Sequence, residues 1–177
     1  GMPYGVPGSV AGGITNASIS FPGQAVRAQD APLPMITMAE VHFMLAEANE
    51  RGWNAPGTAA QHYQDGIQAS WEQWGVYDAN NFNNYIGQAE IAYNSADWQE
   101  KIGYQKWIAL FPQGYEAWAE WRRLDYPQLD PASAALNQSG EIPVRHGYPP
   151  AEAELNGESY EAAVDAQGLS TGLDTKL

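Results

Sequence analysis

The chain has 177 residues, of which 44% are hydrophobic and only 16% charged, and its 21 acidic and 8 basic residues give a net charge of −13. A chain of this length can form one domain that buries about 70% of its unfolded surface. The negative charge argues against a nucleic-acid partner and against adhesion to anionic lipid, since both need a basic surface. The absence of cysteine excludes disulfides, thiolate metal sites and cysteine nucleophiles.

Residues 1–36 are rich in Gly, Pro, Ser and Ala and show little periodicity. We therefore expect an extended arm that runs along the surface, with a possible short strand over 18–21. An independent domain seldom begins with so long a segment of irregular structure. We therefore expect this arm to belong to a larger N-terminal region that this chain lacks.

A helical hairpin is predicted to follow the arm. Thr37 stands three residues before Glu40, which is a capping box for a helix over 38–51. Thr58 is suited to cap a second helix over 59–74. The pair resembles a tetratricopeptide-type unit. Apolar residues at helical spacing predict the buried stripes, which are Met38, Val41, Leu45 and Ala48 in the first helix and Tyr63, Ile67, Trp71 and Trp74 in the second.

The rest of the chain is predicted to alternate between helices and loops. We expect a polar loop over 76–84, a short helix over 86–93, a helix from Ser95, a short strand or extended arm over 141–145, a last helix over 159–166 and a polar tail over 168–177.

The stretch over 101–127 is especially rich in aromatic and basic residues, and it is predicted to form two helices separated by a break at 111–114. Trp118, Trp121 and Arg122 fall on one face of the second helix, so we interpret them as packing residues. Arg122 and Arg123 are expected to lock the following loop through Asp125 or a helix C-terminus. A similar bracing role is predicted for Arg145.

Several segments, in this order, resemble the SusD-like branch of the SusD/RagB family, which comprises surface lipoproteins of Bacteroidetes that bind glycans for import. The resemblance covers about residues 33–177 and corresponds to the C-terminal part of a family member. The segments that carry it are 36–41 with 46–48, 105–111, 116–118 with 121–123, and 142–145 with Tyr148, Pro149, Asn156 and Tyr160.

The resemblance implies an all-α fold of tetratricopeptide-like hairpins with long irregular loops, in which residues 37–177 form a single helical region. It implies that the protein covers a TonB-dependent outer-membrane transporter of the SusC type and captures an oligosaccharide without catalysis. It also implies a location on the outer-membrane surface through a lipid anchor that is absent from this chain.

A sugar site needs aromatic faces together with neutral amides and carboxylates in a concave surface. Such residues occur together after the second predicted helix, and Trp53 in the hairpin turn is a second candidate. The alternative is that the aromatic side chains only pack and that the polar ones cap helices. The candidates after the helix are Trp74, Tyr77, Asp78, Asn80, Asn81 and Asn83, with Phe82 beside them.

Catalysis, a metal site and a cofactor are not expected. Glu116 and Glu120 lie four residues apart, but such pairs are common on solvated helix surfaces. His42, His62 and His146 are dispersed along the chain without the spacing of a zinc motif. A different class of function remains open, namely a protein-interaction scaffold whose aromatic faces bind another chain.

Overall fold

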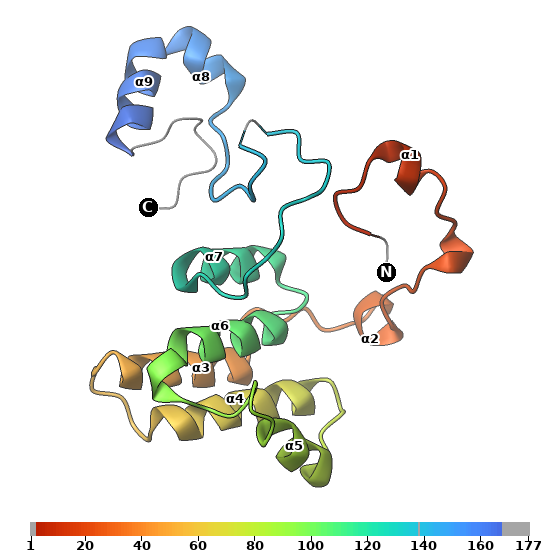
Figure 1. Cartoon of the computed structure of the whole chain (residues 1–177), viewed down its shortest axis with the longest axis vertical. Coiled ribbons are helices and arrows are strands. Elements are labelled where there is room, and N and C mark those ends of the chain that lie inside the picture. The colour runs from red at the N-terminus through yellow and green to blue at the C-terminus, as the bar shows by residue number, and fades with distance from the viewer. Residues whose placement is uncertain (1–2, 138, 168–177) are drawn as a thin grey trace. The chain divides into compact units, whose positions relative to one another are not determined.

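The computed structural model describes residues 3–137 and 139–167, and all regular structure in these two ranges is helical (Figure 1). The all-α prediction is therefore confirmed. The structure groups into two compact units, one formed by Pro22–Gln128 and the other by Gly1–Phe21 with Leu129–Leu177. The predicted division after residue 36 stays a prediction. Within the described ranges, no helix has the length and apolar character needed to cross a membrane.

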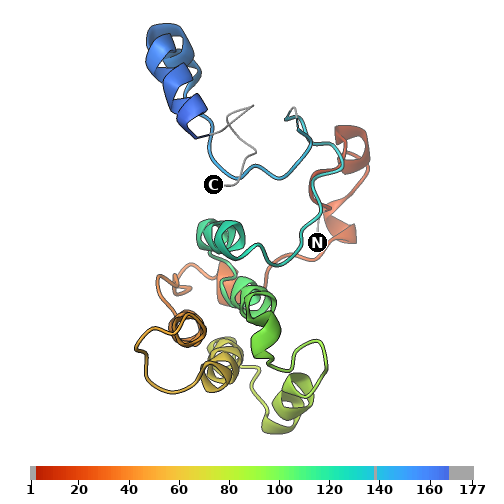
Figure 2. The same ribbon diagram turned by 60° about the vertical axis from the view of Figure 1, so that its left-hand side comes forward.

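The unit formed by Pro22–Gln128 contains most of the helical structure. Its elements are α2 (Gln24–Arg27), α3 (Met38–Glu50), α4 (Ala59–Gln73), α5 (Ala79–Ile86), the 3-10 turn η2 (Ser95–Asp97), α6 (Trp98–Ala109) and α7 (Gly114–Leu124). Helices α3 and α4 lie side by side, α6 packs on both of them, and α7 packs on α6 (Figure 2).

The α3–α4 hairpin forms as the sequence predicts, because both caps are made. The Thr37 hydroxyl accepts a hydrogen bond from the Glu40 amide at 3.2 Å, and the Thr58 hydroxyl accepts one from the Gln61 amide at 3.2 Å. The two helices approach closely at Gly66, where an added Cβ would lie 2.9 Å from the ring of Phe43. Glycine at this position therefore sets the spacing of the hairpin.

The core of this unit is formed where α6 meets the hairpin. Its fully buried side chains include Phe43, Tyr63, Ile67, Ile102 and Leu124. The stripe predicted for α4 is confirmed in part, since Tyr63 and Ile67 are buried. The stripe predicted for α3 is wrong. The buried face of α3 is formed by Ala39, Glu40, Phe43, Ala46 and Glu47, whereas Met38 is exposed.

The predicted loop over 76–84 is instead largely helix α5. The Asp78 carboxylate accepts a hydrogen bond from the Asn81 amide at 2.9 Å and so caps the helix. Phe82 is the buried residue of α5, and Ile86 packs partly buried against the same core. The prediction of a short helix over 86–93 is therefore wrong, because α5 ends at Ile86, the first residue of that range.

The second unit combines the N-terminal segment with the C-terminal part of the chain. The carbonyl of Gly5 accepts hydrogen bonds from the Ala134 amide at 2.8 Å and the Ser133 hydroxyl at 3.1 Å. The predicted strand over 18–21 is wrong, and a 3-10 turn begins just before it. The helical elements of this unit are α1 (Gly8–Ala11), η1 (Asn16–Ser18), α8 (Pro150–Leu155), which the sequence analysis missed, and α9 (Gly157–Ala166). The polar tail predicted over 168–177 lies outside the described residues.

Candidate ligand-binding groove

An open groove lies beside the C-terminal end of α4. Its volume is about 350 Å³, which is within the range of small-molecule sites. Helices α4, α5 and α6 and the turn after α6 all contribute side chains to it. The lining residues are Ile67, Ser70, Trp71, Trp74, Val76, Tyr85, Gln105, Ile108 and Phe111.

Aromatic rings dominate this groove. Trp74 caps the end of α4, and its ring centroid lies 5.8 Å from that of Phe111. Trp71, one turn earlier on α4, lies 5.3 Å from the ring of Tyr85 on α5. These ring contacts line the groove with aromatic faces.

The polar groups of the groove are neutral. Gln105 is buried on α6, and its Nε2 donates to the Tyr85 hydroxyl at 3.0 Å, while Ser70 adds another hydroxyl group on α4. None of the described residues that line the groove is charged. Aromatic faces with a few fixed amide and hydroxyl groups suit an uncharged, hydroxyl-rich ligand better than an ion.

The Asn-rich candidates lie apart from this lining. Asn80, Asn81 and Asn83 are on exposed positions of α5, and Asp78 is engaged in capping that helix. Tyr77 packs against Phe82, with ring centroids 5.6 Å apart. Of the residues predicted to bind sugar, Trp74 is therefore the one that lines the groove. Tyr77 packs and Asp78 caps a helix, as the alternative to a sugar site would have it.

Trp53 lies in the hairpin turn, at the opposite end of α4 from the groove. It is 66% exposed in the turn before α4, and the Arg51 guanidinium lies 5.9 Å from its ring centroid. Trp74 follows the other end of α4, and a helix of 15 residues spans about 22 Å. One small ligand therefore cannot contact both tryptophans.

Trp74 also borders a second recess of about 420 Å³. This recess lies between the segment that follows α2 and the end of α4. Its lining residues are Ala25, Val26, Ala31, Pro32, Leu33, Pro34, Gln73, Trp74 and Pro112. Trp74 thus lines both the groove and this recess.

The residues predicted to be structural make the following contacts, and their predicted roles stay predictions. Trp121 is buried, and the Arg122 guanidinium lies 4.7 Å from the ring of Trp118. In the other unit, the Arg145 guanidinium lies 4.3 Å from the ring of Tyr148 and donates to Gln167 Oε1 at 2.8 Å. The bracing role predicted for Arg145 is consistent with these contacts.

Arg123 makes an ion pair that the sequence analysis did not foresee. It donates to both carboxylate oxygens of Glu47 on α3, with 2.6 Å between Nη2 and Oε2, and it also contacts Glu120. Glu120 in turn lies 3.1 Å from the ammonium of buried Lys106. Glu120 therefore takes part in an ion-pair network with Lys106 and Arg123, whereas Glu116 is exposed.

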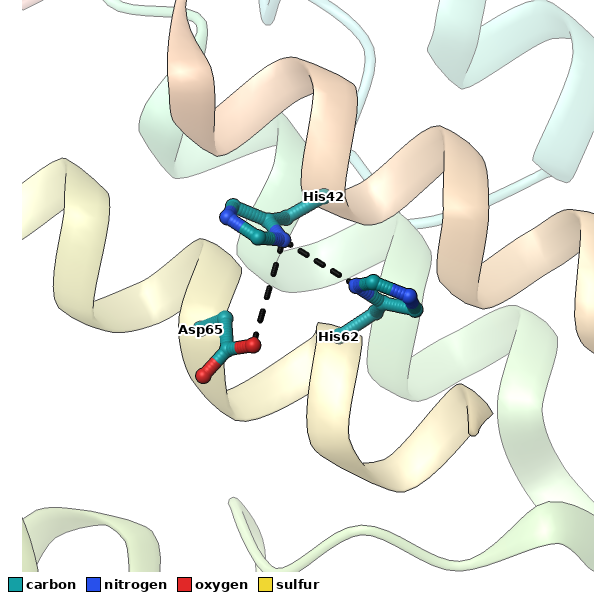
Figure 3. A group of neighbouring side chains, drawn as sticks. All are labelled: His42, His62 and Asp65. Carbon is teal, nitrogen blue, oxygen red and sulfur yellow. Dashed lines mark hydrogen bonds and ion pairs between the residues drawn. The ribbon is translucent and has the colours of Figure 1, made fainter. Parts of the chain in front are cut away.

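Two histidines that are remote in sequence meet on the hairpin. His42 on α3 and His62 on α4 face each other with 3.1 Å between their Nδ1 atoms, and Asp65 lies beside them (Figure 3). These two histidines are dispersed along the chain, as the sequence analysis states, but they are neighbours in the fold. The two histidines are 20 positions apart on either side of the hairpin turn, and the packing of α3 on α4 brings them together.

Comparison with known proteins is consistent with the helical hairpin fold. Residues 1–149 match the model of a family described as starch-binding and associating with the outer membrane, SusD-like. The chain belongs to the SusD-like family. A search of curated proteins gave no match for this SusD-like chain.

Solved structures of SusD-like proteins resemble the chain over about three quarters of its length. The one described as Bacteroidetes AC2a SusD-like is 35% identical, with a TM-score of 0.63 over 73% of this chain and 27% of its own. A SusD homologue from Bacteroides uniformis ATCC 8492 is 33% identical, with a TM-score of 0.64 over 78% of this chain and 35% of its own. A chitin-binding SusD homologue from Flavobacterium johnsoniae is 29% identical, with a TM-score of 0.61 over 78% of this chain and 35% of its own. The SusD-like chain therefore spans about a third of the length of these relatives.

Proposed function

We propose that this SusD-like chain takes part in binding an oligosaccharide at the Trp74 groove, without catalysis, in an outer-membrane nutrient-uptake complex. In that complex the partner is a TonB-dependent transporter of the SusC type, and the protein is held at the cell surface by a lipid anchor. The family description supports association with the outer membrane. The observation that carries the sugar site is the groove itself, where Trp71, Trp74 and Phe111 surround neutral polar groups.

The chemistry of the groove favours a neutral glycan. The apolar face of a pyranose ring can cover an indole ring, and its hydroxyls can pair with the Gln105 amide and the Ser70 hydroxyl. Because no charged side chain among the described lining residues contributes, binding should change little between low and high salt. A relative described as chitin-binding makes chitin oligosaccharides the first probe, with malto-oligosaccharides as the second.

Isothermal titration calorimetry tests this proposal with a matched pair of variants. Trp74→Ala removes an aromatic face from the groove, and we expect its affinity for the bound oligosaccharide to fall about tenfold or more. Trp53→Ala removes an exposed tryptophan from the far end of α4, and we expect it to bind as the unaltered chain does. A flat response of the unaltered chain to both oligosaccharide series, or equal affinities of the two variants, would argue against this site.

One observation favours the alternative, a protein-interaction scaffold. Four exposed apolar side chains follow one another along α6 and the turn after it, at successive intervals of three, one and three positions. They are Tyr104, Trp107, Ile108 and Phe111. Such a spacing forms one continuous apolar face, which is the kind of surface that packs against another helix. In this alternative the aromatic residues bind a protein partner rather than a sugar.

The two functions give different results in solution. If Trp74→Ala leaves oligosaccharide binding intact while Trp107→Ala abolishes self-association measured by light scattering, the scaffold function is favoured. If Trp74→Ala weakens oligosaccharide binding and Trp107→Ala does not, the glycan function is favoured. The effect of sulfate salts gives a second criterion. Self-association through apolar surfaces should strengthen in sulfate, whereas oligosaccharide binding should change little with salt.

A further inference from the structure

We propose that His42, His62 and Asp65 form a binding site for a single divalent transition-metal ion, of the class represented by Zn²⁺, on the α3–α4 hairpin. The site is separate from the Trp74 groove and shares no residue with it. Each residue offers one donor atom, and the three donor atoms lie within 4.8 Å of one another. Among the described residues, this is the group of His, Asp and Glu side chains that meets such a spacing.

The distances fit a metal ion at the centre of the three donors. A tetrahedral zinc ion with bonds of about 2.0–2.1 Å places its ligand atoms about 3.3–3.4 Å apart. The two Nδ1 atoms are 3.1 Å apart, so they need to separate by only a few tenths of an ångström. The Asp65 Oδ2 atom lies 4.0 Å from His42 Nδ1, and its side chain is 41% exposed, so a small rotation brings it into place.

The three proposed ligands lie on facing sides of α3 and α4, so their side chains converge. His62 and Asp65 are three residues apart on α4, which places them on the same face of that helix. His42 is on the neighbouring face of α3, and Figure 3 shows all three side chains directed into the space between the helices. The Nδ1 atoms of both imidazoles point toward each other there.

The surroundings of His62 fix its ring as a metal ligand requires. Its Nε2 lies 2.8 Å from the carbonyl oxygen of Pro56, and because a carbonyl can only accept, Nε2 carries the proton. The lone pair of His62 Nδ1 then points at His42 Nδ1, so a metal ion would replace the hydrogen bond between these two atoms. The same carbonyl also accepts from Asn49 Nδ2 at 3.3 Å, so α3 holds the acceptor in position. A ligating histidine that donates its other N–H to a backbone carbonyl is the usual arrangement in metal sites.

The turn before α4 is shaped to make this contact. Gly57 has a φ of +71°, a conformation that favours glycine, and a Cβ added there would lie 2.7 Å from His62 Nε2. Glycine therefore lets the backbone of the turn lie against the imidazole. His62 is also only 9% exposed, so its ring is held by packing on one side and by the Pro56 carbonyl on the other.

The donor set selects the class of metal. Two imidazole nitrogens and one carboxylate suit Zn²⁺, Co²⁺, Ni²⁺ and Cu²⁺, whereas Ca²⁺ and Mg²⁺ prefer all-oxygen sites. The exposed Asp65 side leaves room for water as a further ligand. A bound ion would join α3 to α4 and would stabilise the hairpin, because the unfolded chain does not bring these three residues together.

Metal titration of the full chain, freed of any polyhistidine tag and treated with a chelator, tests the proposal. We expect one equivalent of Co²⁺ to give the visible absorption of a low-symmetry site and Zn²⁺ to displace it. With free Zn²⁺ at about 100 times its dissociation constant, we expect the thermal midpoint to rise by about 5–10 °C. Mg²⁺ and Ca²⁺ at the same concentration should leave the midpoint unchanged.

Variants separate this site from adventitious binding. We expect His42→Gln and Asp65→Asn each to weaken Co²⁺ binding at least tenfold, and His146→Ala, which alters a histidine of the other unit, to bind as the unaltered chain does. His62→Ala also loses the contact with the Pro56 carbonyl, so circular dichroism must show that this variant folds. If it does not fold, the Co²⁺ affinity of His42→Gln decides whether the site exists. Absence of a one-to-one complex, or equal binding by His42→Gln and His146→Ala, overturns the proposal.

Discussion

The guanidinium of Arg123 in α7 forms a bidentate ion pair with the carboxylate of Glu47 in α3, and the two residues are 76 positions apart. The Glu47 side chain is only 7% exposed, and Arg51, one turn further along α3, donates to it at 2.7 Å. This pair connects two helices that both pack on α6. The pair therefore ties the first helix of the hairpin to α7 across 76 positions of sequence.

Loss of this carboxylate is predicted to destabilise the fold. Glu47→Gln removes the charge but keeps the shape, so Arg51 and Arg123 both lose this counter-charge and Arg123 keeps only Glu120. Arg123 is 41% exposed and can turn to water, so we expect a loss of about 2 kcal/mol in the free energy of unfolding. Thermal unfolding should show a fall of about 4–8 °C in the midpoint. The control Glu161→Gln removes an exposed acid on α9 and should have little effect.

The stability contributed by Glu47 should depend on pH. Burial raises the pKa of the Glu47 carboxyl, but hydrogen bonds and charge from Arg123 and Arg51 outweigh burial, so its pKa lies below the ordinary value. A lowered pKa gives stability that is complete above the ordinary value of about 4.3 and is lost as pH falls through the folded-state value. The difference in unfolding free energy between the unaltered chain and Glu47→Gln should therefore shrink below about pH 4. A difference that stayed constant from pH 7 to pH 3 would contradict this explanation.

The Lys106–Glu120 pair predicts an asymmetry between its two partners. The Lys106 side chain is 2% exposed and lies 3.1 Å from Glu120, which also contacts Arg123. Glu120→Gln leaves a buried ammonium without its counter-charge, so we expect a cost of about 3 kcal/mol. Lys106→Met replaces that ammonium with an apolar group and leaves Glu120 paired, so we expect about 1 kcal/mol or less. Chemical denaturation checks the order, and a larger loss for Lys106→Met would refute it.

Gly66 is predicted to be a steric requirement of the hairpin. Gly66→Ala would place a methyl group 2.9 Å from the Phe43 ring, although alanine favours a helix by about 1 kcal/mol. Overpacking outweighs this gain, so we expect a net loss of about 1–2 kcal/mol in unfolding free energy. Gly114→Ala on α7 is the matched control. It has open space around the added atom and should be neutral or stabilising.

Local signals in the sequence predicted the helices where side chains form caps or breaks. Thr37 and Thr58 cap α3 and α4 as expected, and the break around Pro112 separates α6 from α7. The face of α3 could not be read from its apolar pattern, because Met38 and Phe43 both look suitable for a core. Helix α5 was missed because asparagine is a poor helix former, although Asp78 followed by Phe82 was a readable cap and anchor.

Contacts that join distant segments were beyond the sequence analysis. Nothing in the neighbourhood of Arg123 indicates that its partner is Glu47, and nothing near His42 indicates His62. Both relationships depend on how α3 packs against other helices. In the groove, Trp74 was identified from its aromatic character, whereas the contribution of Gln105 from α6 required the tertiary structure.

The most direct test of glycan binding at the Trp74 groove is an NMR titration that follows the indole N–H signals of all seven tryptophans. With assigned signals and a chitin or malto-oligosaccharide, we predict that Trp74 and Trp71 shift with a common saturation curve while Trp53 and Trp118 do not. No shift at Trp74 and Trp71, in the presence of saturable shifts elsewhere, would contradict the account and place the binding surface outside the groove.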